Sequence, residues 1–310
     1  MNVSSLSLRD LEYVLAVAEQ RHFGKAAALC AVSQPALSAQ IKKIEELTGL
    51  RIFERSRRHV SVAPQAEAFL EQVRVVLNEA RRLVELVTAK REPLSGVFRL
   101  GVIATVGPYL LPHLIRPLRK KYPKLQLIIR EGLTDGLLAE LRAGHLDAVI
   151  ASDTFKDDSL SIDILFQEPF LLAAPKDHPL MLQDSLLPRH LKASEMVLLE
   201  DGHCLKDQVL EVCPANSRGN HRRYHTTSLE TLRHLVASGL GYTLMPLLAV
   251  RPGAEFGGLV SYRGFDGRPV GRNIILVHRK RYANTADIKA LVGLLVERAP
   301  EGMLPVRAGR

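Results

Sequence analysis

Residues 22–50 read "HFGKAAALCAVSQPALSAQIKKIEELTGL", and this stretch decides the fold of the N-terminal part of the chain. Ser33 is suited to cap a helix, Pro35 fits the first turn of that helix, and Gly49 can end it. The small apolar residues 24–32 lead into this helix with almost no connection, which is the spacing of a helix-turn-helix. We therefore predict that two helices form such a motif here.

The second helix of the predicted motif has two chemically different faces. At about 100° per residue, the apolar side chains fall on one side: Leu37, Ile41 and Ile44. The motif runs from Phe23 to Lys42, and its candidate DNA contacts are Gln34, Pro35, Ser38 and Lys42. An amide can bind adenine and a lysine can bind phosphate, so this face suits a recognition helix. Simple solvation of a polar face is the alternative.

A short hairpin with a basic tip is predicted to follow the motif. Two apolar runs, residues 50–53 and 60–63, flank Arg55, Arg57 and Arg58. This pattern predicts a β-wing whose arginines would contact the DNA backbone or minor groove beside the recognition helix. The formal net charge of +9 favours a polyanionic partner only weakly, since many soluble proteins are equally basic.

The stretch from residue 22 to residue 55, which continues the quoted sequence into "RIFER", resembles the winged helix-turn-helix of the LysR-type transcriptional regulators. The run "VSQPALS" and the following "IFER" carry this resemblance. It implies a regulator that binds double-stranded promoter DNA, associates with itself as a dimer or tetramer, and acts together with RNA polymerase.

Residues 65–91 predict one long helix that no Gly or Pro interrupts. Its apolar side chains recur at alternating intervals of four and three: Phe69, Val73, Val76, Ala80, Leu83 and Val87. This interval is typical of a coiled coil, so the seam packs either on its own domain or on a second copy, and the resemblance implies the second. Pro93 and Gly96 then mark a boundary. We divide the chain into residues 1–64, 65–91 and 92–310.

The third of these parts alternates strand-like and helix-like segments, which predicts an α/β fold with a largely parallel sheet. Residues 106–123, "VGPYLLPHLIRPLRKKYP", predict a helix that is interrupted by prolines. The pattern indicates two small α/β lobes with a cleft at the carboxyl ends of the strands. The resemblance implies a layout similar to that of periplasmic binding proteins, with chain crossovers near residues 167 and 270.

Composition limits the class of protein. The chain has 310 residues, of which 46% are hydrophobic and 24% charged, as in globular proteins of two or three domains. No run of about 18 apolar residues and no signal-peptide pattern occurs, so we expect a cytoplasmic protein without a membrane partner. Three cysteines cannot form a disulfide framework, which leaves transient redox chemistry or packing as their role.

Residues 202–213, "GHCLKDQVLEVC", hold two of the three cysteines at a spacing that suits neither zinc nor a dithiol enzyme. Apolar residues recur here at helical spacing: Leu205, Val209 and Val212. Pro214 discourages continuation of this helix. A helix rises about 13 Å over nine residues, whereas a disulfide needs Cα atoms within about 7 Å. Cys204 and Cys213 could therefore bond only if the helix unwound, which is a property of a switch.

Cys204 is the better nucleophile of the two, because the N-terminus of a helix stabilises a thiolate. His203 and Lys206 can add positive charge beside it, and Asp207 opposes them. Such a thiolate attacks peroxide to give a sulfenic acid, which Cys213 can condense to a disulfide. Burial of both cysteines as small apolar residues is the alternative.

Packing and metal binding are further possible roles for the cysteines. Cys30 precedes the predicted turn in an apolar stretch, and we assign it to packing. A metal site made of His203, His225 and both cysteines of residues 202–213 has no recognised ligand spacing. We therefore expect no metal and no cofactor.

Residues 202–213 together with 226–250, "TTSLETLRHLVASGLGYTLMPLLAV", resemble the peroxide-sensing branch of the LysR-type regulators, and the likeness extends over essentially the whole chain. It implies that Cys204 is peroxidatic and Cys213 resolving. Disulfide formation would remodel the regulatory domain and its dimer packing on DNA, and a cellular thiol reductant would reset it. The resemblance also implies a peroxide pocket made of Thr105, Thr134, His203, Lys206, Asp207 and Arg272.

Two other functions remain open at this point. A regulator of the same family could sense an ordinary metabolite in the cleft, with incidental cysteines. A thiol peroxidase could use the same reactive cysteine. The DNA-binding motif and the lack of a nucleotide-binding motif favour a regulator, and we predict that the protein is not an enzyme.

Overall fold

The computed structural model describes residues 6–55, 60–87, 92–152, 157–214, 225–250 and 255–305. They belong to two compact units, residues 1–89 and 90–310, and each unit is considered by itself. No helix among the described residues combines the length and the apolarity that crossing a lipid bilayer requires.

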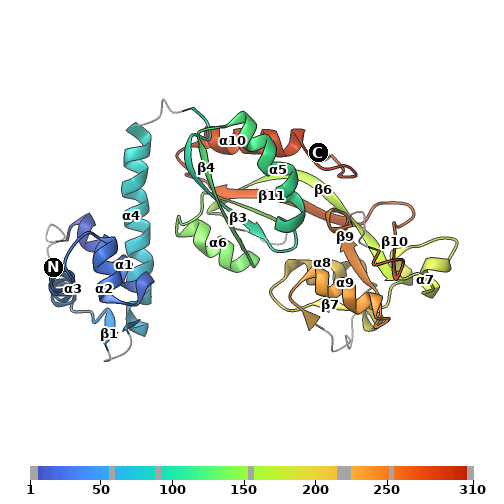
Figure 1. Cartoon of the computed structure of the whole chain (residues 1–310), viewed down its shortest axis with the longest axis horizontal. Helices are drawn as coiled ribbons and strands as arrows, with labels where there is room; N and C mark the ends of the chain where they lie inside the picture. The colour runs from blue at the N-terminus through green and yellow to red at the C-terminus, as the bar shows by residue number, and fades with distance from the viewer. Residues whose placement is uncertain are drawn as a thin grey trace. The chain divides into compact units, whose positions relative to one another are not determined.

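The first unit is a helical bundle with a two-stranded wing (Figure 1). Its elements are α1 (Leu8–Gln20), α2 (Phe23–Leu29), α3 (Gln34–Thr48), β1 (Phe53–Arg55), β2 (Val60–Val62) and α4 (Glu67–Val87). The Ser33 hydroxyl caps α3 by accepting a hydrogen bond from the Ala36 amide, and Gly49 ends the helix at φ 67°. The predicted helix-turn-helix and its wing are therefore confirmed.

The core of this unit lies under the inner face of α3. Leu37, Ile41 and Ile44 are buried there, as helical periodicity predicts. The rings of Phe23 and Phe53 meet edge to face in the same cluster, with centroids 6.2 Å apart. This packing fixes α3 and the wing to one rigid core, because each element contributes side chains to it.

The apolar seam of α4 is divided between two environments. Val73 is buried together with Leu77 against Leu11 and Leu15 of α1. Leu83, further along the helix, is 67% exposed. One part of the seam thus packs on its own domain, and another part presents apolar surface to solvent.

The second unit is built on a seven-stranded sheet with the order β10-β6-β11-β5-β3-β4, and β9 pairs with β6. Its strands are β3 (Gly96–Ile103), β4 (Leu125–Gly132), β5 (Ala148–Ser152), β6 (Leu160–Pro175), β9 (Thr243–Pro246), β10 (Val260–Arg263) and β11 (Gly271–Arg279). A small separate sheet pairs β7 (Leu198–Leu199) with β8 (His225–Thr226). The helices are α5 (Gly107–Lys121), α6 (Thr134–Arg142), α7 (Pro179–Leu182), α8 (Cys204–Val212), α9 (Leu229–Ala237) and α10 (Thr285–Glu297).

The prediction of a largely parallel sheet is wrong. In the seven-stranded sheet only β3–β4 and β3–β5 are parallel, and the other pairs are antiparallel. The reason is the path of the chain: β6 leaves the first lobe and β11 returns from the second, so the two strands run in opposite directions. A strand–helix alternation indicates parallel pairing only while the chain stays within one lobe.

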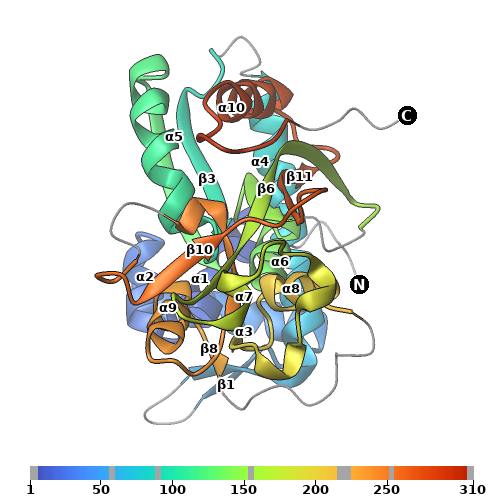
Figure 2. The same ribbon diagram turned by 90° about the vertical axis from the view of Figure 1, so that its right-hand side faces the viewer.

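The long strand β6 belongs to both lobes. Residues 160–169 pair with β11, and residues 170–175 pair with β9 and β10. In the first lobe α5 and α10 cover one face of the sheet and α6 the other (Figure 1). In the second lobe α8 and α9 both contact β7. Figures 1 and 2 show these two helices in the same lobe as α7.

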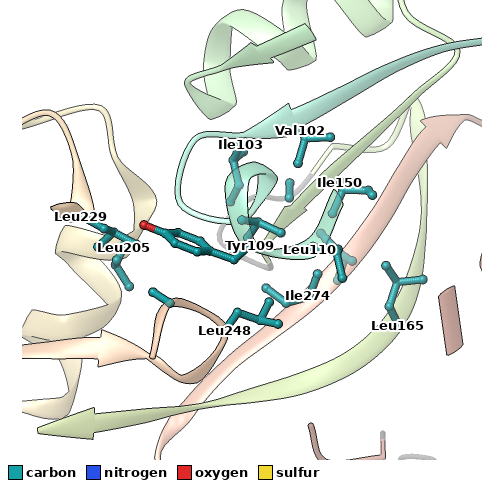
Figure 3. Close-up of a cluster of buried hydrophobic side chains, with 14 of the residues drawn as sticks. Val102, Ile103, Tyr109, Leu110, Ile150, Leu165, Leu205, Leu229, Leu248 and Ile274 are labelled. Atoms are coloured by element: carbon teal, nitrogen blue, oxygen red, sulfur yellow. The ribbon is translucent and has the colours of Figure 1, made fainter. Parts of the chain in front are cut away.

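Helix α5 differs from its prediction, because Pro112 and Pro117 do not interrupt it. A proline removes one helical hydrogen bond, and burial of an apolar face can outweigh that loss. Tyr109 and three leucines of α5 are buried in the main core. Tyr109 points towards Leu205 of α8 (Figure 3), and its hydroxyl donates to the Glu230 carboxylate over 3.1 Å. The core is thus continuous between the lobes.

Candidate functional site

The cysteine segment forms the helix α8, with its two thiols at opposite ends. Cys204 is the first residue of α8, and His203 precedes it as the N-cap. Gly202 turns the chain into the helix at φ 94°, a conformation that favours glycine. Cys213 is the C-cap, and no disulfide joins the two cysteines. At 1.5 Å per residue their Cα atoms are separated along the axis by about 13 Å, so they are not placed for a disulfide.

A small cavity lies at the Cys204 end of α8. Three segments meet around it: the end of β3 at residues 103–105, the β4–α6 junction at residues 132–134, and the start of α8 at residues 202–204. Its volume is about 10 Å³. That is room for roughly one water-sized molecule. The cavity therefore suits a very small ligand, and an ordinary metabolite does not fit into it.

Three of the predicted pocket residues line this cavity together with Cys204: Thr105, Thr134 and His203. All three are buried. Burial lowers the pKa of His203, which the Glu200 carboxylate only partly opposes. Burial thus disfavours the imidazolium form, which works against the expected positive charge beside the thiol.

Arg272 reaches the cavity through Thr105. Its Nη1 donates to Thr105 Oγ1 over 2.9 Å, and its Nη2 donates to the Thr105 carbonyl over 3.1 Å. Its Nε donates to Glu168 over 2.8 Å, in an ion pair that is fully buried. Since Thr105 Oγ1 accepts from Arg272, its own hydrogen remains to be donated to a ligand. The Arg272 guanidinium thus orients the Thr105 hydroxyl of the cavity. Arg272 pairs with Glu168 on β6, next to the residue at which β6 changes its partner strand.

Lys206 and Asp207 do not line the small cavity. The Lys206 ammonium lies 2.5 Å from Asp201 Oδ1, which takes up its charge. Asp207 is exposed and lines a second, larger cavity. The resemblance implied that Lys206 and Asp207 belong to the peroxide pocket, but in the structure neither residue lines the small cavity.

This larger cavity has a volume of about 1300 Å³ and lies between α8 and the segment that leads into β11. Charged residues of both signs line it: Asp207, Glu211, Asp266, Arg268 and Arg272. Its size suits a metabolite, so it is the candidate site for the alternative function. It lacks a cysteine, and Cys204 does not open into it.

The sequence analysis did not predict two residues that lie next to Cys204 Sγ, which are Ser152 and Gln208. Ser152 Oγ lies 3.2 Å from Cys204 Sγ, and Gln208 Nε2 donates to Ser152 Oγ over 2.9 Å. Gln208 follows Cys204 by four residues, so helical projection would have placed both on one face. Ser152 is the last residue of the buried strand β5. It therefore lies at the carboxyl ends of the parallel strands, where the binding sites of α/β folds occur.

The other two cysteines have apolar surroundings. Cys213 is buried, and its Sγ lies 3.3 Å from Met196 Sδ. Cys30 is the C-cap of α2 and packs against the core of the first unit, where burial raises the pKa of its thiol. Within the described ranges no three His, Cys, Asp or Glu side chains gather as a metal site, and the His225 side chain is not among the side chains described.

The outer face of α3 carries the predicted DNA contacts. Gln34, Pro35 and Lys42 are exposed and Ser38 is half-buried. Lys42 lies 3.6 Å from Glu46, both largely exposed, so the pair is weak and leaves the lysine available to a phosphate. The Arg55 side chain, Arg57 and Arg58 lie outside the described residues.

A helix-turn-helix unit and a two-lobed α/β unit with a small buried site define a class, the two-domain bacterial regulators. Residues 8–67 match the family model "Bacterial regulatory helix-turn-helix protein, lysR family", and residues 91–300 match the "LysR substrate binding domain". The chain belongs to the LysR family. Within that family it falls in the OxyR branch, the hydrogen peroxide-sensing regulators.

Individual relatives give the same result. The "DNA-binding transcriptional dual regulator OxyR" of Escherichia coli K12 is 42% identical over 275 residues, which cover 88% of this chain and 90% of the relative. The "Hydrogen peroxide-inducible genes activator" of Pectobacterium carotovorum is 40% identical over 289 residues, which cover 91% of this chain and 95% of the relative. A solved full-length OxyR variant of Pseudomonas aeruginosa is 35% identical, with a TM-score of 0.82 over 97% of this chain and 99% of that one. An H2O2-bound OxyR mutant of Corynebacterium glutamicum is 29% identical, with a TM-score of 0.62 over 94% and 92%.

Proposed function

We propose that this protein is a DNA-binding transcriptional regulator that senses hydrogen peroxide by oxidation of Cys204. The observation that carries the proposal is the small cavity, in which one thiol meets two threonine hydroxyls and a buried imidazole. Its size supports selection of a ligand of very few atoms. The names of the relatives support the same ligand and a role in transcription.

The first chemical step is attack of the Cys204 thiolate on one peroxide oxygen. An S–O bond forms, the O–O bond breaks, and the sulfur loses two electrons to peroxide. Hydroxide leaves and takes up a proton to become water. The Thr105 hydroxyl, which Arg272 holds, and the Thr134 hydroxyl orient the two oxygens in line with the sulfur.

The second step joins the two ends of α8. The Cys213 thiol attacks the sulfenic sulfur of Cys204, a disulfide forms, and water leaves. Because the two thiols stand at opposite ends of an intact helix, α8 must unwind. Leu205, which is buried in the core beside Tyr109, must then leave its position. A cellular thiol reductant, as electron donor, restores both thiols.

The consequence for transcription passes through the regulatory unit. Unwinding of α8 alters the packing between the lobes and so the arrangement of the subunits of a dimer or tetramer on promoter DNA, where RNA polymerase is contacted. Exposed apolar residues of α4 such as Leu83 supply part of the dimer surface. The α3 face and the wing bind DNA, and the protein acts in the cytoplasm as a regulator, without turnover as an enzyme.

One specific observation favours a second candidate function. The larger cavity of about 1300 Å³ has charged walls and a volume that suits a metabolite. If it were the sensing site, the cysteines would be incidental and the response to peroxide would not depend on them.

A reporter experiment separates these functions. Transcription from a target promoter is measured after a peroxide pulse in cells that carry the wild type, Cys204→Ser, Cys213→Ser or Cys30→Ser. We expect Cys204→Ser to abolish the response, because the oxidised atom is gone, and Cys30→Ser, the matched control, to keep it. A normal response of Cys204→Ser would refute sensing at this thiol. A full response of Cys213→Ser would show that the signal is a sulfenic acid and not the disulfide.

A further inference from the structure

We propose that Ser152 and Gln208 form a hydrogen-bond relay that stabilises the thiolate of Cys204, and that the relay exists only while α8 is folded. This inference rests on the proposed function, since it assigns two further residues to the same reaction. Ser152 contacts the reacting sulfur, and Gln208 is a positioning residue that acts through Ser152.

The direction of the hydrogen bonds follows from the atoms. Gln208 Nε2 carries two hydrogens and can only donate, so Ser152 Oγ accepts from it over 2.9 Å. The serine hydroxyl has one hydrogen of its own, and its remaining close partner is Cys204 Sγ at 3.2 Å. Ser152 is fully buried, so an unused hydroxyl hydrogen would be costly there. The serine therefore donates to sulfur, and such a bond favours the thiolate over the thiol.

The side-chain amide of Gln208 is buried although only one of its two polar atoms has a hydrogen-bond partner in the part of the chain that the structure describes. Gln208 is buried, with 7% of its surface exposed, and its Oε1 has no hydrogen-bond partner among the described residues. A buried unpartnered acceptor destabilises a fold, and the one hydrogen bond that this amide makes among those residues comes from its other end. That other end is the Nε2 that orients Ser152.

The relay joins two elements that the proposed switch separates. Ser152 belongs to β5 in the rigid sheet, whereas Cys204 and Gln208 are one turn apart on α8. When α8 unwinds, the sulfur and the amide no longer share a face, so the relay is broken. The reactive state of the thiol is therefore tied to the folded state of the helix that its oxidation destroys.

Other charged or titratable groups surround the site without bonding the sulfur. Burial lowers the pKa of His203, Arg272 is committed to Thr105 and Glu168, and Lys206 is paired with Asp201. Among the described residues Ser152 is the one side chain that hydrogen-bonds Cys204 Sγ. The serine is thus the direct control on this thiol, and the charges act from a greater distance.

The test is the pH profile of Cys204 alkylation by iodoacetamide in the reduced, full-length protein. Trypsin releases Cys204 in the peptide of residues 193–206, which holds no other cysteine, so mass spectrometry follows this thiol alone. Ser152→Ala removes the donor, Ser152→Thr keeps a hydroxyl, Gln208→Met removes the amide at similar length, and Gln208→Glu supplies an acceptor in its place. Circular dichroism and thermal unfolding identify the variants that remain folded.

We expect the midpoint pH of alkylation to rise by about one unit in Ser152→Ala, equivalent to a roughly tenfold smaller thiolate fraction at neutral pH. Ser152→Thr should restore the wild-type profile. Gln208→Glu should raise the midpoint more than Gln208→Met, because a carboxylate takes the serine hydrogen away from sulfur.

An unchanged or lowered midpoint in folded Ser152→Ala would overturn the relay, since it would mean that the serine accepts from the thiol. If Ser152→Ala does not fold, the two Gln208 variants decide the question, and equal midpoints for them would overturn it as well. The profile needs neither peroxide nor DNA, so failure of the relay is distinguishable from failure of the proposed function.

Discussion

At the scale of single residues, the site depends on how each polar atom is committed. Arg272 donates to two atoms of Thr105 and to Glu168 at once, which only the planar guanidinium can do. Glu168 also accepts from the Leu248 amide over 2.9 Å, so the ion pair connects both lobes to one cavity hydroxyl. Loss of one partner from a buried ion pair of this kind lowers the free energy of unfolding by about 3–5 kcal/mol, because the other charge is left buried and unpaired.

The buried imidazole of His203 makes one pH dependence predictable. Its pKa in the folded protein is lowered by burial from an unfolded value of 6.5. As the pH falls through that value, the unfolded chain binds a proton before the folded chain does, so the free energy of unfolding decreases. We predict that His203→Asn loses less stability than the wild type between pH 7.5 and roughly 5 in urea unfolding.

His113→Asn is the matched control for this prediction, because His113 is exposed on α5 and its replacement should leave the wild-type profile intact. A His203→Asn profile as steep as that of the wild type would mean that burial does not lower the pKa of the imidazole in the folded state.

At the scale of elements, the periodicity of the sequence was most informative where one face of a helix is buried. It placed Leu37, Ile41 and Ile44 on the inner face of α3 and started α8 beside Cys204. It could not give the direction of β11, which depends on the excursion of the chain through the second lobe. It also missed Ser152, because a contact 52 residues away in the chain from Cys204 exists only after the sheet and α8 meet.

The exposed face of α3 yields a prediction of DNA binding. Ser38→Ala combined with Lys42→Ala should weaken binding to a target promoter, and loss of the lysine should reduce the slope of log affinity against log salt by about one. Fluorescence anisotropy at several salt concentrations measures both quantities. Lys176→Ala, which alters an exposed lysine of the second unit, is the control. Affinity and slope equal to those of the control would remove α3 as the recognition helix.

At the scale of the whole molecule, the proposed switch would couple the sensing site on the sheet to the folding of α8, whose two ends carry Cys204 and Cys213. The core is continuous between the lobes, with Tyr109 bonded to Glu230 and directed towards Leu205 (Figure 3). A change in α8 therefore cannot remain local, because its apolar face is part of that core. The sequence predicted a short helix between the two cysteines, and the structure adds the core contacts of Leu205 and Val209 that this helix would lose if a disulfide formed.

In the proposed sensing reaction, peroxide links Cys204 to Cys213 within one chain. Trypsin cleaves after Lys206, between the two cysteines, so the disulfide would join the peptides of residues 193–206 and 207–218. The most direct measurement is mass spectrometry of a non-reducing tryptic digest after stoichiometric peroxide. We predict this linked pair in the wild type, its loss on reduction, and sulfenic acid on Cys204 alone in Cys213→Ser. Two unlinked, reduced peptides after peroxide would contradict the account.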